Sequence, residues 1–488
     1  MMNQTKIYTA LIAVLFILAG AGCEKQLTEE PYSQLVPDNF LTTKDGLQSV
    51  LYAAYTEEGA MSGQASVKGF IAIPEMCTDL LWQTSGSDNR VCAQIINFSW
   101  DPSTQWFFSM LWRRPYLAIR DANAVLDNLD RVEDISDEEK TAYAAEARFI
   151  RAISYYHLYL FFGPVPLRKS SQDSLQLSRA TEEQMRSFIE SELTDVAGLL
   201  PDPGKEAAYG RANKGAAMAF LCKYYLNTKQ WQKCADMARQ IIDLQDYALY
   251  PDYFGLFQAA NERNKEFIWV RQASVLGPGN VFMSSYYPPD FQQDPKTGLT
   301  FMGRNFGAQY RLLDGFYNSF DPEDKRLELI LTEYINSKGK TISLLDADNT
   351  RSFKYWPDPN QEANNNGNDI PEIRYADILL SRAEALNELQ GPNQASIDLI
   401  NQIRHRAGLT DIALADYGSK AQLRQHILAE RGWEFYSEGK RRQDLLRMGQ
   451  FINNAQVRGK AAKDFHKLFP IPQQAMDSNP RLQQNPGY

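Results

Sequence analysis

The chain has 488 residues and a formal net charge of −9 at pH 7, from 51 Lys and Arg against 60 Asp and Glu. An acidic chain without a block of Lys and Arg repels phosphate, so we exclude nucleic acid as a partner, and an anionic polysaccharide would require a local exception. The length exceeds that of a usual single domain, but no Gly/Ser-rich or Pro-rich linker divides the middle of the chain, which predicts one large composite domain.

The N-terminus has the pattern of a bacterial lipoprotein signal peptide. An apolar run follows Lys6 and ends in small residues directly before Cys23. The run is shorter than the about 20 residues of a membrane-spanning helix, which favours a signal peptide over residues 1–22. A strict lipobox has Leu or a similar residue where this chain has Gly20. We predict that Cys23 is acylated and anchors residues 23–488 at a membrane, whereas the alternative is a secreted protein in which Cys23 is a thiol.

Apolar residues at three- and four-residue steps predict a mostly α-helical protein. The steps recur in four regions of helical pairs, at about 107–162, 182–244, 374–407 and 420–453. The second region includes two helices joined by a short turn, with packing residues placed as in a tetratricopeptide hairpin. In the third region, Gly391 and Pro392 end one helix before the next begins. Such pairs bury their apolar faces only against neighbours, which predicts a stacked, tetratricopeptide-like scaffold.

Two long irregular regions, at about 59–106 and 259–368, interrupt the helices. They are rich in Gly, Pro, Asn, Asp and aromatic residues. Loops beyond about 15 residues in a compact protein are usually functional or disordered, and the aromatic content argues against disorder. We therefore expect these two loop insertions to form the ligand-binding face.

Motifs for enzyme chemistry are absent from the sequence. It contains no G-x-S-x-G, H-E-x-x-H or P-loop, and its four His residues are scattered. His157 is expected to be a packed, hydrogen-bonded imidazole inside a helix. One catalytic alternative stays open, a glycoside hydrolase that uses Glu75 and Asp79 as its two carboxylates.

No cofactor is predicted. Oxygen-rich turns at Asp346, Asp348 and Asn349, or at 364–369, could hold a structural Ca²⁺, but neither has EF-hand spacing, and solvated turn residues are the simpler interpretation. Past Cys23 the chain has four cysteines without zinc-like spacing and without an assignable disulfide pairing: Cys77, Cys92, Cys222 and Cys234.

The composition of the irregular regions favours sugar binding. A sugar ring has an apolar C–H face and a rim of hydroxyls, so a glycan site combines exposed aromatic platforms with Asn, Asp, Arg or Gln side chains. One cluster with this composition lies in each region. The predicted substrate-binding residues are Trp82, Asn89, Arg90, Tyr286, Tyr287 and Arg304. Other large aromatics are expected to lie in the core: Trp100, Trp106, Trp112 and Tyr310.

The last 21 residues, 468–488, are poor in helix formers and contain four prolines. Proline blocks regular backbone hydrogen bonding, and such a tail frays unless the fold docks it. The apolar Leu468, Phe469, Ile471 and Leu482 predict an extended segment that packs across the helical body.

Several sequence segments recur in the order typical of one known family. They are E-A-R-F-I-R-A at 146–152, G-P-V-P-L at 163–167, I-R-Y-A-D-I-L-L at 373–380, E-R-G-W-E-F with E-G-K-R at 430–441, and the P-I-P, N-P and Q-N-P-G-Y elements of the last 21 residues. With these segments the chain resembles the SusD/RagB family of outer-membrane nutrient-binding lipoproteins. The charges of these helices are expected to form structural pairs and not an active site: Arg148, Arg151, Arg374, Asp377, Glu384, Glu430, Glu434 and Asp444.

The resemblance implies a non-enzymatic lipoprotein on the outer-membrane surface. Such a protein would bind an oligosaccharide or polysaccharide and deliver it to a SusC-like TonB-dependent transporter. The two insertions would then converge on one exposed, shallow site. A peptide-binding member of the same family and a surface glycoside hydrolase are the alternatives.

Overall fold

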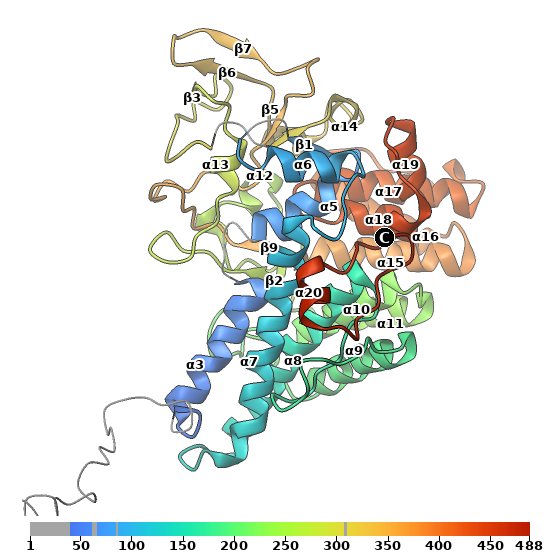
Figure 1. The fold of residues 1–488 in the computed structure, drawn as a ribbon. Helices are drawn as coiled ribbons and strands as arrows, with labels where there is room; N and C mark the ends of the chain where they lie inside the picture. Colours follow the sequence, from blue (N-terminus) through green and yellow to red (C-terminus); the bar gives the residue numbers. More distant parts are fainter. Residues whose placement is uncertain (1–39, 61–65, 84–85, 307–309) are drawn as a thin grey trace, which may run out of the picture.

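Figure 1 shows the computed structural model of the protein, which describes residues 40–60, 66–83, 86–306 and 310–488. The predicted signal peptide and Cys23 lie outside the described residues. The protein is mostly α-helical, as predicted. No helix of the described part combines the length and the apolar character that a membrane crossing requires.

The scaffold is a stack of helices in which each helix packs on the next. Its long helices are α3 (Lys44–Tyr55), α7 (Arg113–Asn128), α8 (Asp137–Phe162), α9 (Glu182–Ala197), α10 (Lys214–Asn227), α11 (Trp231–Asp243), α15 (Tyr375–Gln390), α16 (Gln394–Arg406) and α17 (Lys420–Phe435). Helix α3 lies beside α7 and α8, and α9, α10 and α11 follow (Figure 1). Helix α11 packs on α15 although an insertion separates them in sequence, and α15 contacts α16 and α17. This arrangement confirms the predicted tetratricopeptide-like stacking.

Local signals explain where these helices begin and end. At the start of α8, the Ser136 hydroxyl accepts the Glu139 N–H while the Glu139 carboxylate accepts the Ser136 N–H. Helix α15 ends at Gly391, whose φ of 83° lies in the left-handed region that favours glycine. The predicted helix stop at this position is therefore confirmed.

The remaining helical elements are short. The last predicted helical stretch divides into α17, α18 (Arg441–Arg447) and α19 (Phe451–Val457). Other short helices are α5 (Ile73–Met76), α6 (Asn89–Ile96), α12 (Tyr253–Leu256), α13 (Phe282–Tyr286), α14 (Asp314–Tyr317) and α20 (Gln473–Ser478). Single 3-10 or π turns occupy Thr56–Ala60, Ser66–Ala72, Phe107–Trp112, Leu129–Arg131, Ala259–Asn261, Lys325–Leu329, Leu414–Asp416 and Asp464–Lys467.

The strands are short and pair antiparallel. They are β1 (Leu81–Gln83), β2 (Phe267–Arg271), β3 (Phe291–Gln293), β4 (Tyr310–Leu312), β5 (Ile330–Leu331), β6 (Glu333–Asn336), β7 (Thr341–Ser343), β8 (Arg351–Ser352) and β9 (Ile370–Arg374). Strand β2 pairs with β9, which closes the base of the second insertion just before α15. Strand β1 pairs with β4, so the two irregular regions meet in one small sheet. Strands β3, β6 and β7 form a three-stranded sheet, and β5 pairs with β8.

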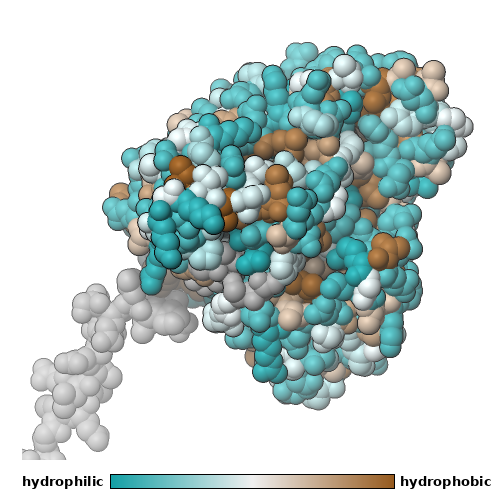
Figure 2. Space-filling model, turned by 90° about the horizontal axis from the view of Figure 1, so that it is seen from above, coloured by the Kyte–Doolittle hydropathy of each residue, from teal (hydrophilic) through white to brown (hydrophobic). Residues whose placement is uncertain are grey.

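The strand-bearing insertion projects from the helical body in Figure 1. The face seen from that side is mostly hydrophilic, with small, separate hydrophobic patches (Figure 2). Large exposed apolar side chains of the described residues are likewise scattered, for example Leu276 and Leu345 of the insertion. Single exposed apolar residues are normal on protein surfaces, so the scattered apolar side chains of this face do not indicate an interaction site.

The C-terminal tail packs across the helical body, as predicted, and Phe469, Ile471 and Leu482 are buried. The Phe469 N–H donates to the Phe161 carbonyl at 2.8 Å, and its ring stacks on Phe107 with a centroid distance of 4.3 Å. The Asn485 side-chain amide donates to the carbonyls of Phe162 at 3.0 Å and Phe469 at 2.8 Å. The tail departs from a fully extended course because the short helix α20 interrupts it.

A network of buried ion pairs joins the scaffold to the base of the insertion. This ionic core consists of Glu266, Arg326, Arg374, Arg406, Glu434 and Glu438. Arg374 contacts Glu266 at 2.6 Å, Glu434 at 2.5 Å and Glu438 at 2.8 Å. Glu434 also contacts Arg326 at 3.3 Å and forms a pair with Arg406. Burial alone would raise the pKa of Glu434, but Arg406, Arg374 and Arg326 lower it to about 2.

The eight charged motif residues expected to have structural roles all form ion pairs. Outside the ionic core, Arg151 contacts Glu192 at 2.7 Å, and Asp377 contacts Lys223 at 2.7 Å. The others pair as Arg148 with Glu192 and Asp195, Glu384 with Arg447, Glu430 with Arg326, and Asp444 with Arg431 and Arg447. The structural interpretation of these charges is confirmed.

The four described cysteines are buried free thiols. Cys222 and Cys234 face each other across the α10–α11 hairpin, with their Sγ atoms 3.9 Å apart. Cys77 donates instead to the carbonyls of its own helical turn. The structure therefore shows no disulfide among these four cysteines, and Cys222 and Cys234 are the two whose sulfur atoms are in contact.

Replacing Glu434 with Gln should strongly destabilise the protein. The substitution removes the charge shared by Arg326, Arg374 and Arg406, and breaking a buried ionic contact costs about 3–5 kcal/mol. Urea unfolding of Glu434→Gln and of the control Glu333→Gln, on the exposed side of β6, would measure this. The control should change the free energy of unfolding by less than about 0.5 kcal/mol. If both substitutions changed the free energy of unfolding equally, the ionic core would not be the stabilising feature that we infer.

Candidate functional site

A cavity of about 730 Å³ opens where the first irregular region meets α14, α17 and α19. Three aromatic side chains contribute to its wall, Trp82 of β1, Phe316 of α14 and Trp433 of α17. Polar and charged residues complete the wall: Asp79, Ser319, Asp348, Gln425, Arg441, Asn454, Arg458 and Lys460. The cavity therefore combines apolar ring surface with hydrogen-bonding groups of both kinds.

The strand pairing of β1 with β4 positions Trp82. Trp82 lies opposite Arg311 in the register, and the Arg311 guanidinium lies 5.0 Å from the indole centroid. The indole N–H donates to the Asp348 carbonyl at 2.5 Å. Because both contacts hold the ring in one orientation, the half-buried Trp82 forms a fixed part of the cavity wall.

Helix α17 positions Trp433. One face of this helix carries Glu430 and Glu434 into the core, whereas Gln425, Ala429, Gly432 and Trp433 follow one another along the face that lines the cavity. The Trp433 indole N–H donates to the Ser319 hydroxyl at 3.0 Å. Both cavity indoles thus use their N–H groups within the protein, which leaves ring surface for apolar contact.

A bidentate ion pair forms the polar part of the wall. The Arg441 guanidinium contacts the two carboxylate oxygens of Asp79 at 2.9 and 2.7 Å. Burial opposes ionisation of Asp79, but Arg441 holds the pKa of this carboxyl below its usual range. A Cβ atom at Gly432 would lie 3.0 Å from Arg441 Nη1, so glycine leaves the space in which this guanidinium packs.

The other predicted sugar-binding residues do not line this cavity. Asn89 and Arg90 are exposed at the first turn of α6, the helix that follows β1. Arg304 is exposed in the second insertion, after β3. Of the six predicted residues, Trp82 is the one that the structure places in this cavity.

The expectation that Tyr286 and Tyr287 form an exposed platform is wrong. Both rings are fully buried. Tyr286 stacks on Phe282, one helical turn earlier in α13, with a centroid distance of 4.1 Å, and Tyr287 packs against Phe291 and Phe301. The second insertion needs a core of its own, and these rings supply it. The predicted core positions of Trp100, Trp106, Trp112 and Tyr310 are confirmed by their burial.

Comparison with known proteins identifies the family. Residues 245–488 match a family model described as the SusD family. The chain belongs to the SusD family. Residues 25–226 match a second model, described as starch-binding and associating with the outer membrane. The resemblance in the sequence motifs is thereby confirmed.

Relatives of this SusD family protein cover nearly its whole length. SusD-like protein P25 of Formosa agariphila is 28% identical over 538 aligned residues, which cover 98% of each chain. The starch-binding protein SusD of Bacteroides thetaiotaomicron is 25% identical over 500 residues and 86% of each chain. The solved structure of surface glycan-binding protein A from B. thetaiotaomicron, in complex with laminarihexaose, is 21% identical. It covers 91% of this chain and 100% of that chain with a TM-score of 0.76, which shows a shared fold.

The carboxylates of the hydrolase alternative do not share a cavity in this SusD family protein. Asp79 lines the cavity, but both of its oxygens contact Arg441. Glu75 is fully buried, accepts the Gly439 N–H at 2.9 Å, and has its pKa raised to about 8 by burial. A glycosidase needs both carboxyl groups beside one glycosidic bond, and this geometry does not supply them.

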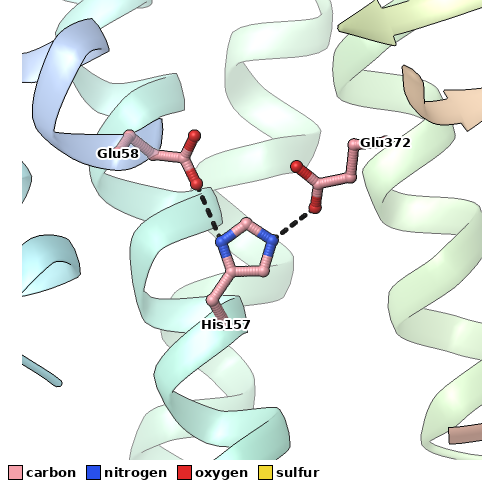
Figure 3. Close-up of side chains that lie close together, drawn as sticks. All are labelled: Glu58, His157 and Glu372. Atoms are coloured by element: carbon pink, nitrogen blue, oxygen red, sulfur yellow. Dashed lines mark hydrogen bonds and ion pairs between the residues drawn. The ribbon is translucent and has the colours of Figure 1, made fainter. Parts of the chain in front are cut away.

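One cluster among the described residues has the composition of a metal site, Glu58, His157 and Glu372 (Figure 3). His157 Nδ1 lies 2.8 Å from Glu58, and Nε2 lies 2.5 Å from Glu372. The two ring nitrogens point away from each other, so the carboxylates hold the two N–H groups of an imidazolium and do not converge with the ring on one ion. Arg271 contacts both carboxylates, at 3.6 and 2.6 Å, and would repel a cation. The predicted packed, hydrogen-bonded imidazole is confirmed.

Three of the side chains considered as calcium ligands, Asp348, Asn349 and Asp369, already have protein partners. Asp348 accepts the Asp314 N–H at 2.7 Å, and Asn349 accepts from the Arg351 guanidinium at 2.7 Å. In the stretch 364–369, the Asp369 carboxylate accepts the Ala273 N–H at 2.9 Å and the Tyr209 hydroxyl at 2.8 Å. These side chains therefore act as turn and loop stabilisers.

Sequence reasoning missed most of the cavity. Trp433 and Arg441 belong to the family motifs but are not among the predicted binding residues, although a Trp beside the small residues Ala429 and Gly432 on one helix face is a signal that the sequence contains. Arg458 and Lys460 gave no signal, because single cations near a helix end are common on protein surfaces.

The stability of the protein should depend on pH because His157 forms its contacts with Glu58 and Glu372 as a protonated ring. Burial alone disfavours the charged ring, but Glu372 and Glu58 outweigh it and raise the pKa of His157 to about 9. The unfolded ring titrates near about 6.5. The stabilisation is therefore complete below about pH 6.5 and is lost as the pH rises to about 9.

The comparison of wild type with His157→Gln tests this. The difference between their free energies of unfolding should be largest at pH 6 and should shrink toward pH 9.5. Groups that do not contact His157 titrate alike in both proteins, so they cancel in the difference. Parallel stability curves over this range would show that the ring is not held as an imidazolium.

Proposed function

We propose that this SusD family protein is a surface-exposed, lipid-anchored protein of the outer membrane that captures an oligosaccharide or polysaccharide and delivers it to a SusC-like TonB-dependent transporter. The ligand is bound and released without chemical change. Its site is the cavity between Trp82 and Trp433, with Asn89, Arg90 and Arg304 as outlying contacts on the same pair of insertions.

The observation that carries this proposal is the pair of fixed, half-buried indoles in a polar cavity. Trp82 and Trp433 can each cover the apolar face of a sugar ring, while the Asp79–Arg441 pair, Gln425 and Asn454 offer partners for hydroxyls. Contacts within the protein itself hold both indoles in place, which reduces the entropic cost of binding. The starch-binding name of one relative and the laminarihexaose complex of one structural neighbour agree with a glycan as ligand.

The anchor and the partner rest on the N-terminal sequence and on the family. A lipoprotein-type leader precedes Cys23, and one family description places its members at the outer membrane. A mostly helical binding domain has no route of its own for moving cargo across that membrane. Passage therefore requires a transporter, and the tether keeps captured cargo close to it.

Removing either indole should weaken glycan binding. Trp82→Ala and Trp433→Ala should each lower the affinity for an oligosaccharide about tenfold, since stacking on an aromatic ring contributes on the order of 1 kcal/mol. Calorimetry on the detergent-solubilised full chain, with a panel of oligosaccharides and peptides, measures the affinities. Trp231→Ala, at the half-buried start of α11, is the matched control and should bind as wild type does.

The same mixtures separate the alternatives. Intact glycan recovered after saturable binding supports capture. Cleaved glycan would establish the hydrolase, and a response to peptides alone would establish a peptide-binding member of the family.

Lipidation of Cys23 is tested independently of the ligand. Mass spectrometry of the protein purified from membranes should show an N-terminal peptide that begins at Cys23 and carries acyl chains. Cys23→Ser should lack them, because serine has no thiol to acylate. An unmodified thiol at position 23 of the wild type would instead indicate an ordinary secreted protein.

A further inference from the structure

Two cations on the cavity wall, Arg458 and Lys460, make no close contact with a carboxylate of the described residues. Arg458 caps the end of α19, and Lys460 follows it in the adjoining turn. Among the described residues, neither forms an ion pair. Arg458 donates to the carbonyls of Asn454 at 3.1 Å and Cys77 at 3.2 Å, and Lys460 donates to the Asn97 side chain at 2.9 Å. Both cations are thus held by neutral oxygens beside the cavity.

This situation differs from that of the ionic core. There, Arg326, Arg374 and Arg406 each contact at least two carboxylates. Other buried arginines form no ion pair: Arg442 donates to the Lys467 carbonyl, and Arg351 donates to the Tyr310 carbonyl and the Asn349 side chain. Arg458 and Lys460 differ from these arginines because they are half-buried and line one cavity together, where a ligand can reach them.

The cavity carries a net positive charge. Two carboxylates line it, Asp79 and Asp348, against three cations, Arg441, Arg458 and Lys460, which leaves one excess positive charge. Asp79 already pairs with Arg441, and the Asp348 carboxylate accepts a backbone N–H. The uncompensated charge thus lies at the α19 side of the cavity.

Electrostatic effects within the wall favour an incoming anion. Burial lowers the pKa of Arg458 although the charge of Asp79 opposes this shift, and burial and the charge of Arg458 together lower the pKa of Lys460. Arg311, which does not line the cavity, packs on Trp82, and burial lowers its pKa as well. An anion placed between Arg458 and Lys460 would relieve their mutual repulsion.

We infer that the cavity selects an acidic glycan, a sugar chain that carries uronate carboxylates or sulfate esters. The anionic group lies against Arg458 and Lys460 while the sugar rings lie against Trp82 and Trp433. This inference rests on the proposed function and specifies its substrate class. The excess positive charge of the cavity wall allows this otherwise acidic protein to bind an anionic polysaccharide.

The test compares charged and neutral ligands on the detergent-solubilised full chain. The probes are an oligogalacturonide, a sulfated galactan oligosaccharide, maltohexaose and laminarihexaose, each titrated by calorimetry at 50 and 500 mM NaCl. At least one acidic probe should bind about tenfold or more tightly than either neutral probe, because a charge-assisted hydrogen bond contributes more than a neutral one. Its affinity should fall with salt. The two acidic probes distinguish a carboxylate from a sulfate ligand.

Substitutions of Arg458 and Lys460 test whether these two cations cause the preference for acidic probes. Arg458→Glu should abolish binding of the acidic probe, and the milder Lys460→Gln should weaken it about fivefold and reduce its salt dependence. Lys205→Gln is the matched control because it removes one exposed cation outside the cavity, and it should change neither affinity nor salt dependence. Thermal unfolding of each variant confirms that it is folded.

The outcomes separate this inference from the proposed function. Neutral probes that bind as tightly as acidic ones would overturn the inference and leave glycan capture standing. If Arg458→Glu and Lys460→Gln still bound acidic probes more tightly than neutral ones, the inference would also be overturned. Other residues would then bind the anionic group. Failure of all four glycans to bind would count against the proposed function itself.

Discussion

The ionic core is the constraint on which the rest of the structure depends. Its members come from the segment before β2, from the turn before β5, from the β9–α15 junction, from the end of α16, from α17 and from the turn after α17. A buried charge without a partner is far more costly than a buried pair, so Arg374 and Glu434 are tolerated only when all of these segments dock together. The network therefore specifies how the helical stack meets the insertion, even where its net stabilisation is small.

The candidate site is built on the outer side of this network. Helix α17 places Glu434 in the ionic core and the preceding residue, Trp433, in the cavity. The adjoining turn holds the first insertion, since the Gly439 N–H donates to Glu75 and a Cβ at Gly439 would lie 1.7 Å from the Phe70 carbonyl oxygen. Arg441 then pairs with Asp79, two residues before β1. The indoles are thus positioned by the same segment that anchors the core.

Sequence periodicity was sufficient for the helices but not for the site. Apolar steps and the Gly391 stop depend on local chemistry, so the stack could be predicted. The motif charges could be interpreted because an opposite charge offsets part of the cost of burying a charge. The orientation of loop aromatics depends on long-range contacts, as when the ring of Tyr286 lies against Tyr310 of β4. Composition alone does not distinguish such a ring from the half-buried Trp82. Arg458 reaches the cavity through the chain fold, which no local pattern encodes.

Net charge is a poor guide to the ligand of such a cavity. At physiological ionic strength, exposed charges farther away than about 8 Å are largely screened, so most acids of this protein contribute little at the wall. Arg458 and Lys460 are half-buried, where the lower effective dielectric strengthens their interaction with a nearby anion. An anionic sugar therefore responds to the few cations within one screening length and not to the total of −9. The acidic surface would still slow the association of such a ligand at low salt. Selectivity therefore depends more on the dissociation rate, which Arg458 and Lys460 lower, than on the association rate.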